Sequence, residues 1–109
     1  MSFDVVPIPA FVKELKRLAK KYRSLRTELG QLGNALAKDP KMGTPLGNDC
    51  YKIRVAIKSK GAGKSGGVRV ITCVMAVREE VYLLSIYDKS EQATLTDRRL
   101  KELLKQIPR

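Results

Sequence analysis

Five polar side chains between residues 52 and 89 are of types that could act together on a phosphate group. They lie within or just beyond apolar runs: Lys52, Arg54, Arg69, Tyr87 and Lys89. Lys52 and Arg54 share one face of an extended strand by their spacing, and Arg69 interrupts a β-branched run. Cations from neighbouring strands, together with an aromatic hydroxyl, can grip phosphates and stack on a base, which is how single-stranded nucleic acid is usually held.

Three of these side chains also have a purely structural explanation. Lys52 and Arg54 could form the solvated face of a strand, and Tyr87 could be an aromatic residue of the core or of its rim. Arg69 is more informative, because a charge inside an apolar strand needs either a partner or a function.

The absence of histidine limits the chemistry that this set could perform. It removes the commonest general base and every Ser/His or Cys/His catalytic pair. The carboxylates are scattered along the chain, so neither a metal site nor a cofactor is expected. A lysine is then the natural base, since like-charged neighbours disfavour its ammonium form.

The charge balance points to an anionic partner. The chain has 109 residues, 43% of them hydrophobic, which suits one domain over residues 1–109 with a modest core. It carries 22 Lys and Arg against 11 Asp and Glu, a net charge of +11. Such a surplus indicates nucleic acid, an acidic protein or an anionic membrane as the partner.

The cysteines and the termini bear on the compartment. Cys50 and Cys73 lie in predicted strands without CxxC spacing, so buried free thiols in a reducing compartment are expected. No apolar run approaches the roughly 20 residues that cross a bilayer, and the N-terminus lacks a signal-peptide pattern. The cytoplasm is therefore the expected location.

The first part of the chain predicts a short strand and a basic amphipathic helix. Phe3–Pro7 is an expected edge strand, because its proline interrupts a ladder. From Pro9 onward, apolar residues recur every three or four positions, as on the buried face of a helix. The opposite face is basic, which is typical of a solvated helix but could also bind RNA.

A second helix is expected next. Ser24 is its predicted N-cap, and Asp39-Pro40 ends it. Gly30 and Gly33 weaken this helix, or allow the two helices to approach closely. Lys41–Asp49 is predicted to be a loop.

Three strands and a last helix complete the expected fold. The strands are Cys50–Lys58, Val68–Val77 and Val81–Tyr87, the last two forming an antiparallel hairpin. Thr96 is expected to cap a helix over Asp97–Gln106. The order β-α-α-β-β-β-α, with a mostly antiparallel sheet, an N-terminal helical hairpin and a C-terminal helix, is an α+β fold.

The loop between the first two of these strands imitates nucleotide-binding motifs. Gly61, Gly63 and Gly66 match G-x-G-x-x-G, a motif that needs a following helix to meet the phosphates. A β-branched run follows instead, so nucleotide binding is rejected. A cationic hairpin tip remains, whose lysines are predicted RNA contacts: Lys58, Lys60 and Lys64.

Several stretches together carry a resemblance to a known family. They are Pro45–Gly47, Asp49–Arg54, Val68–Ile71, the insertion Lys60–Gly67 and Tyr87–Glu91. The chain resembles the RelE/ParE superfamily of bacterial toxins, most closely its RelE-like and HigB-type members. The similarity extends over nearly the whole chain, because the order of elements matches too.

That resemblance implies the RelE-like fold and the toxin half of a type II toxin–antitoxin pair, with a cognate antitoxin as its protein partner. RelE-like members cut messenger RNA in the ribosomal A site without a metal, which inhibits translation. The 2′-hydroxyl attacks the adjacent phosphate and leaves a 2′,3′-cyclic phosphate.

The resemblance also implies roles for individual residues. By position, Lys52 and Arg54 match the family's basic pair, and Arg69 matches its phosphate-gripping arginine. Lys89 stands where another arginine is usual. We expect Lys52 to act as the base, Arg69 to stabilise charge, and Lys89 to act as an acid or contact the phosphate.

The sequence departs from the family at its C-terminal tyrosine, since Leu95 falls near that position. Either Tyr87 takes over stacking, or activity is weaker than in typical members. Two alternatives remain: a ParE-like inhibitor of DNA gyrase, and a non-catalytic module that binds RNA or the ribosome.

Overall fold

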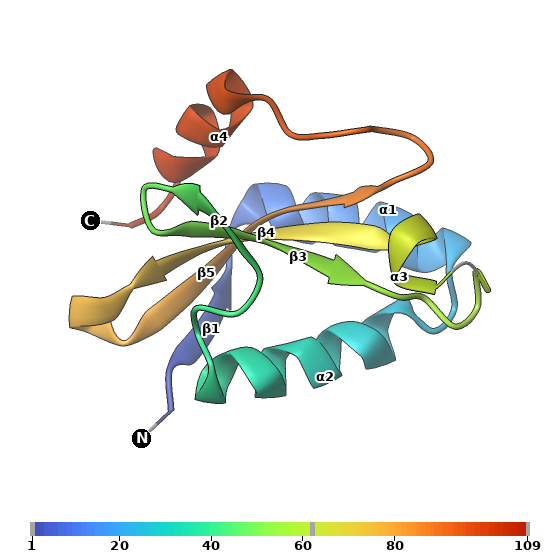
Figure 1. Cartoon of the computed structure of the whole chain (residues 1–109), viewed down its shortest axis with the longest axis horizontal. Helices are drawn as coiled ribbons and strands as arrows, with labels where there is room; N and C mark the ends of the chain where they lie inside the picture. Colours follow the sequence, from blue (N-terminus) through green and yellow to red (C-terminus); the bar gives the residue numbers. More distant parts are fainter. Residues whose placement is uncertain (1, 62, 109) are drawn as a thin grey trace.

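The protein is a five-stranded sheet with helices on both faces (Figure 1). The computed structural model describes residues 2–61 and 63–108, without the side chains of Lys64 and Ser65. Within these residues the strand order is β1-β5-β4-β3-β2. The strands are β1 Asp4–Pro7, β2 Thr44–Gly47, β3 Cys50–Val55, β4 Val68–Met75 and β5 Glu80–Asp88. β1 pairs in parallel with β5, and the other three pairings are antiparallel.

The helices flank this sheet on two sides. They are α1 Pro9–Lys21, α2 Leu25–Lys38, the single turn α3 Gly63–Gly66, the 3₁₀ turn η1 Ala76–Arg78, and α4 Asp97–Leu104. α2 lies against one face of the sheet and α4 against the opposite face (Figure 1). The main helices precede or follow the run of antiparallel strands in the sequence, which is the α+β fold that the sequence predicts.

The apolar spacing of the first two helices accounts for their packing. Pro9 occupies the first turn of α1, where its missing N–H has no helical partner to lose. Phe11 and Leu18 are buried on α1, and Leu25 and Leu36 are fully buried on α2. These side chains join the apolar residues of β4 and β5 in one core, so the amphipathic pattern predicted both helices correctly.

Two details of α2 differ from the prediction. Ser24 occupies the N-cap position, but its hydroxyl donates to Glu28 Oε1 at 2.9 Å instead of capping a backbone N–H. A Cβ added at Gly30 or Gly33 would meet nothing within 4 Å. The expectation that these glycines let the helices approach closely is therefore wrong.

β3 ends three residues earlier than predicted. Ile57 turns into the core with 1% of its surface exposed, and the Lys58 N–H donates to Glu28 Oε2 at 2.7 Å. The Ser59 N–H donates to Ser24 Oγ at 3.0 Å. The start of α2 holds this turn. Lys58 therefore does not continue the strand face of Lys52 and Arg54, and the prediction that the strand extends to Lys58 is wrong.

The sequence also missed short elements around the sheet. β2 lies where a loop was predicted, because its proline and glycine are poor strand formers and all four of its residues are exposed. The strand predicted to reach Val77 ends at Met75, where η1 begins. A left-handed Glu79, with φ of 55°, then starts the return into β5.

Gly67 has no room for a side chain. A Cβ at this position would lie 2.0 Å from the Val55 carbonyl oxygen, and the Gly67 carbonyl accepts the Lys89 N–H at 3.2 Å. Gly67→Ala is therefore expected to destabilise the protein by about 2–3 kcal/mol, because the ends of β3 and β4 would have to separate. Urea unfolding measures this change.

The matched control is Gly30→Ala, which places a methyl group in open space on α2. That variant is expected to gain up to about 1 kcal/mol from its better helix propensity. Equal stability of the Gly67→Ala variant and the parent protein would contradict the packing described for the start of β4.

Candidate active site

Three of the five predicted site residues form one row across the sheet, here called the three-strand row. Arg54 on β3 lies directly opposite Arg69 on β4, and Arg69 lies directly opposite Tyr87 on β5. Residues that face each other across a ladder project to the same side of the sheet. Lys52 projects to that side too, because it is two residues from Arg54 on the same strand.

Burial rises from β3 toward the centre of the row. Arg54 is exposed and Lys52 is half-buried. Arg69, by contrast, is only 3% exposed, and its Nη1 donates to the Val68 carbonyl at 3.3 Å. A buried guanidinium beside two more exposed cations gathers positive charge on this side of the sheet, which suits a bound anion.

Tyr87 is packed more tightly than a stacking platform would be. It is only 4% exposed and belongs to the hydrophobic core. Burial raises the pKa of Tyr87, while the charge of Arg69 and polar contacts with Thr94 and Leu95 oppose this rise. The connector between β5 and α4 therefore passes beside the Tyr87 hydroxyl, and the ring offers little surface on which a base could stack.

The remaining predicted cations are placed differently from one another. Lys89 is exposed and directly follows β5, where its N–H holds Gly67. Lys58 is exposed in the turn after β3. Lys60 is committed to an ion pair with Asp88, with 2.6 Å between Nζ and Oδ1. The side chain of Lys64 lies outside those that the structure describes.

Asp88 is a central residue of this region that the sequence analysis did not single out. Its side chain is fully buried and accepts hydrogen bonds from Lys60 Nζ, from the Tyr22 hydroxyl, and from Ser90 Oγ and N–H at 2.7 and 2.9 Å. Burial opposes the negative charge, but the bonds from Lys60, Tyr22 and Ser90 hold the pKa of Asp88 well below its usual range.

The Asp88 contacts join three separate segments at one end of the sheet. Tyr22 follows α1, Lys60 lies in the β3–β4 connection, and Ser90 begins the connector to α4. Asp88 therefore fixes the end of β5, immediately beside Tyr87 and Lys89. The sequence did contain a partial signal, since an aspartate two residues before a serine often bonds that backbone N–H.

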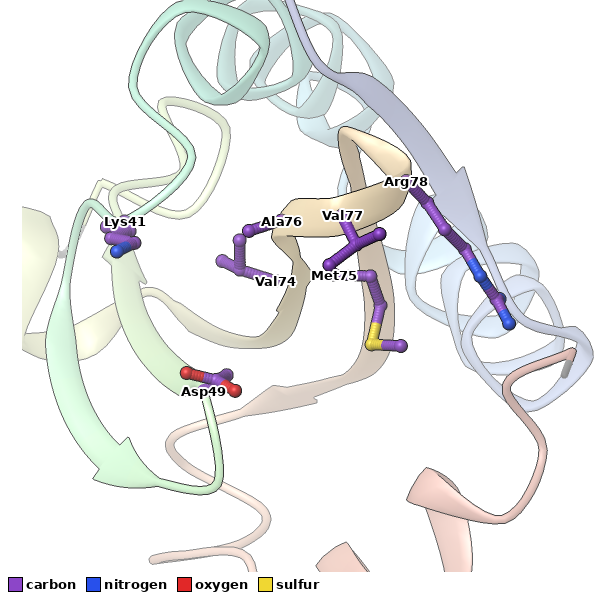
Figure 2. Close-up of a pocket in the computed structure, with 7 residues that line it drawn as sticks. All are labelled: Lys41, Asp49, Val74, Met75, Ala76, Val77 and Arg78. Atoms are coloured by element: carbon purple, nitrogen blue, oxygen red, sulfur yellow. The ribbon is translucent and has the colours of Figure 1, made fainter.

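A hollow of about 300 Å³ lies near the end of β4, and Figure 2 shows the residues that line it. It is lined by Lys41, Asp49, Val74, Met75, Ala76, Val77 and Arg78. These residues cluster around the end of β4, whereas Arg69 lies near its start. The hollow therefore does not contribute to the row.

Within residues 2–61 and 63–108, no group of three or more His, Cys, Asp or Glu side chains could hold a metal ion. None of the helices in the described part of the chain is long and apolar enough to cross a bilayer.

Comparison with known proteins relates this geometry to a family. The sequence model of the protein family described as RelE toxin of the RelE/RelB toxin–antitoxin system matches residues 11–107. A free-state structure of an E. coli toxin RelE mutant superposes with a TM-score of 0.65 at 19% identity, covering 99% of this chain and 100% of that one. The isolated E. coli RelE toxin superposes with a TM-score of 0.61 at 17% identity, covering 98% of this chain and 100% of that one. At such identities the superpositions establish a shared fold.

Proposed function

Because this chain belongs to the RelE toxin family, we propose that it is a toxin that stops translation by cutting messenger RNA on the ribosome. The observation that supports cleavage most directly is the three-strand row with Lys52 beside it. These side chains offer a candidate base, a buried cation and an exposed cation on one side of the sheet. A phosphodiester held there would contact Lys52 and Arg54 and would lie above the buried charge of Arg69.

The proposed reaction uses the 2′-hydroxyl of the RNA as the nucleophile. Lys52 takes the 2′-hydroxyl proton, the 2′-oxygen bonds to the adjacent phosphorus, and the bond to the 5′-oxygen breaks. Arg54 holds the phosphate oxygens as their negative charge grows, and the buried charge of Arg69 stabilises that negative charge from within the sheet. Lys89 gives a proton to the departing 5′-oxygen, so that the products are a 2′,3′-cyclic phosphate and a 5′-hydroxyl.

The other predicted residues take supporting parts in this proposal. Tyr87 positions Arg69 and the connector from within the core and does not stack on a base. Lys58 and Lys64 contact the RNA backbone outside the reacting phosphate. Lys60 holds the β3–β4 connection through Asp88, since its ammonium is already paired.

Family membership also implies an antitoxin as the protein partner. We propose that this partner is acidic where it meets the basic side of the sheet, because the chain carries a net charge of +11. A ribosomal target places the activity in the cytoplasm. The proposed reaction calls for no cofactor and no metal ion, since every proton transfer is assigned to a side chain.

Expression in a bacterial host tests the proposal. The chain expressed alone is expected to stop growth and to produce new 5′ ends inside translated messages, and co-expression of its genomic neighbour is expected to abolish both. Growth arrest with intact messages and broken DNA would contradict the proposal in favour of a gyrase inhibitor. Arrest with the protein bound to ribosomes but no cut message would contradict it in favour of a binding module.

A further inference from the structure

Two free cysteines face each other at one end of the β3–β4 ladder. Cys50 begins β3 and lies directly opposite Cys73 on β4. Both are free thiols, 1% and 3% exposed. The Asn48 carbonyl oxygen lies 3.4 Å from Cys50 Sγ and 3.9 Å from Cys73 Sγ. The two sulfur atoms therefore converge on one oxygen atom from adjacent strands.

The ladder geometry brings this pair close together. The Val74 N–H donates to the Asp49 carbonyl at 2.9 Å, so the neighbouring pair Asp49–Val74 is hydrogen-bonded. Pairs alternate along an antiparallel ladder, which makes Cys50–Cys73 a non-hydrogen-bonded pair, with Cα atoms roughly 4.5 Å apart. That separation lies at the short end of the range of about 4.4–6.8 Å that a disulfide spans.

The two thiols are not equivalent. The hydrogen bond between them raises the pKa of Cys50 and lowers that of Cys73, against the effect of burial, so Cys73 ionises before Cys50. Cys73 also lines a cavity of about 260 Å³ together with Leu104 and Ile107 of the C-terminal segment. Cys73 is therefore the cysteine that borders a space from which a small reagent would approach, and Cys50 is not among the residues that line it.

We propose that Cys50 and Cys73 form a reversible thiol–disulfide exchange site that links β3 to β4 when a low-molecular-weight disulfide is present. The Cys73 thiolate attacks one sulfur of the reagent, forming a mixed disulfide and expelling a thiolate. The Cys50 thiol loses its proton and attacks the Cys73 sulfur, releasing the second half of the reagent. One disulfide bond is consumed and one is formed, so electrons and protons balance.

The cross-link would act on the same strands that carry the candidate site. Cys50 lies on the same side of β3 as Lys52 and Arg54, and Cys73 lies four residues from Arg69 on β4. A bond at this position closes the loop that contains the β3–β4 connection and restricts the unfolded chain. Oxidation is therefore expected to raise the melting temperature by roughly 5 °C or more.

The test uses the folded full-length protein and hydroxyethyl disulfide as the probe, with acid quenching and intact mass measurement over time. We expect a monomer lighter by two hydrogen atoms, with no thiol left to alkylate and a raised melting temperature that reductant reverses. Cys50→Ser should stop at the mixed disulfide on Cys73, whereas Cys73→Ser should react far more slowly.

Three results would overturn the proposal, and all are visible in the unmutated protein. The first is that both thiols stay reduced for as long as the fold persists, while denatured protein oxidises. The second is a product linked between two chains. The third is oxidation that lowers the melting temperature. Since no RNA or ribosome is involved, failure here is distinct from failure of the proposed nuclease activity.

Discussion

Replacing Arg69 with methionine is expected to slow messenger RNA cleavage by at least about 100-fold while the protein remains folded, because removal of one charge-stabilising group from a reaction centre has effects of this size. Arg69 is 3% exposed, and methionine fills a similar volume without charge. The measurement is the rate of cleavage by purified protein on programmed ribosomes, with a thermal melt of each variant.

Two variants make the Arg69 result specific. Arg98→Met removes the same charge from α4, where the Arg98 side chain is 93% exposed, and is expected to cut at the parental rate. Arg69→Lys keeps the charge but loses the planar guanidinium and the hydrogen bond that holds it in place, so an intermediate rate is expected. A folded Arg69→Met variant that cuts as fast as the parent protein would remove Arg69 from the mechanism.

Replacing Asp88 with asparagine is expected to lower the free energy of unfolding by about 3 kcal/mol at neutral pH, since the buried partner of Lys60 loses its charge. Chemical denaturation at several pH values measures this. The loss corresponds to a folding equilibrium about 100-fold less favourable. A loss of this size is expected because the contacts of Asp88 join the end of α1, the β3–β4 connection and the end of β5.

Asp88→Asn is also expected to change how the free energy of unfolding depends on pH. The pKa of Asp88 is held below its ordinary value of 3.8, so its stabilising effect is complete above that value and is lost as the pH falls below it. The pKa of Lys60 is raised above its ordinary value of 10.5 by the Asp88 hydrogen bond, against the effect of burial. The stabilisation that the Lys60 ammonium contributes is therefore complete below pH 10.5 and is lost at higher pH.

Glu91→Gln is the matched control for Asp88→Asn. Glu91 pairs with Arg17 at 2.9 Å, but both side chains are substantially exposed, so little change in stability is expected. The parent protein should lose stability more steeply below pH 3.8 than Asp88→Asn does. If the parent protein and Asp88→Asn lost stability in parallel as the pH falls, Asp88 would not carry the charge assigned to it.

The strand period explains why the core of the candidate site could be predicted. Alternation along the sequence assigned Lys52 and Arg54 to one face of a strand, and Arg69 to the strand beside it. The exact pairing of Arg54 with Arg69 was not predictable, because residues 56–67 connect β3 to β4 and no short turn fixes the register of these two strands. The α+β fold was predictable for the same reason, because each long element has a clear helical or strand period.

The remaining features depend on contacts between distant residues. Asp88 bonds to Tyr22 and to Lys60, which lie 66 and 28 residues away in sequence. The turn that ends β3 at Val55 depends on Glu28, which lies 30 residues before the Lys58 N–H that it accepts. No local pattern encodes such partners. The burial of Tyr87 likewise depends on where the connector to α4 passes, which its sequence leaves open.

The chemical nature of the cut ends tests the central proposal most directly. Purified protein would be added to ribosomes stalled with a defined codon in the A site, and the 3′ end of the upstream fragment would be analysed. The proposed mechanism predicts a 2′,3′-cyclic phosphate at that end, formed by the parent protein and lost in the Lys52→Gln and Arg69→Met variants. Message left intact by the parent protein, or cut by either variant at the parental rate, would contradict the proposed mechanism.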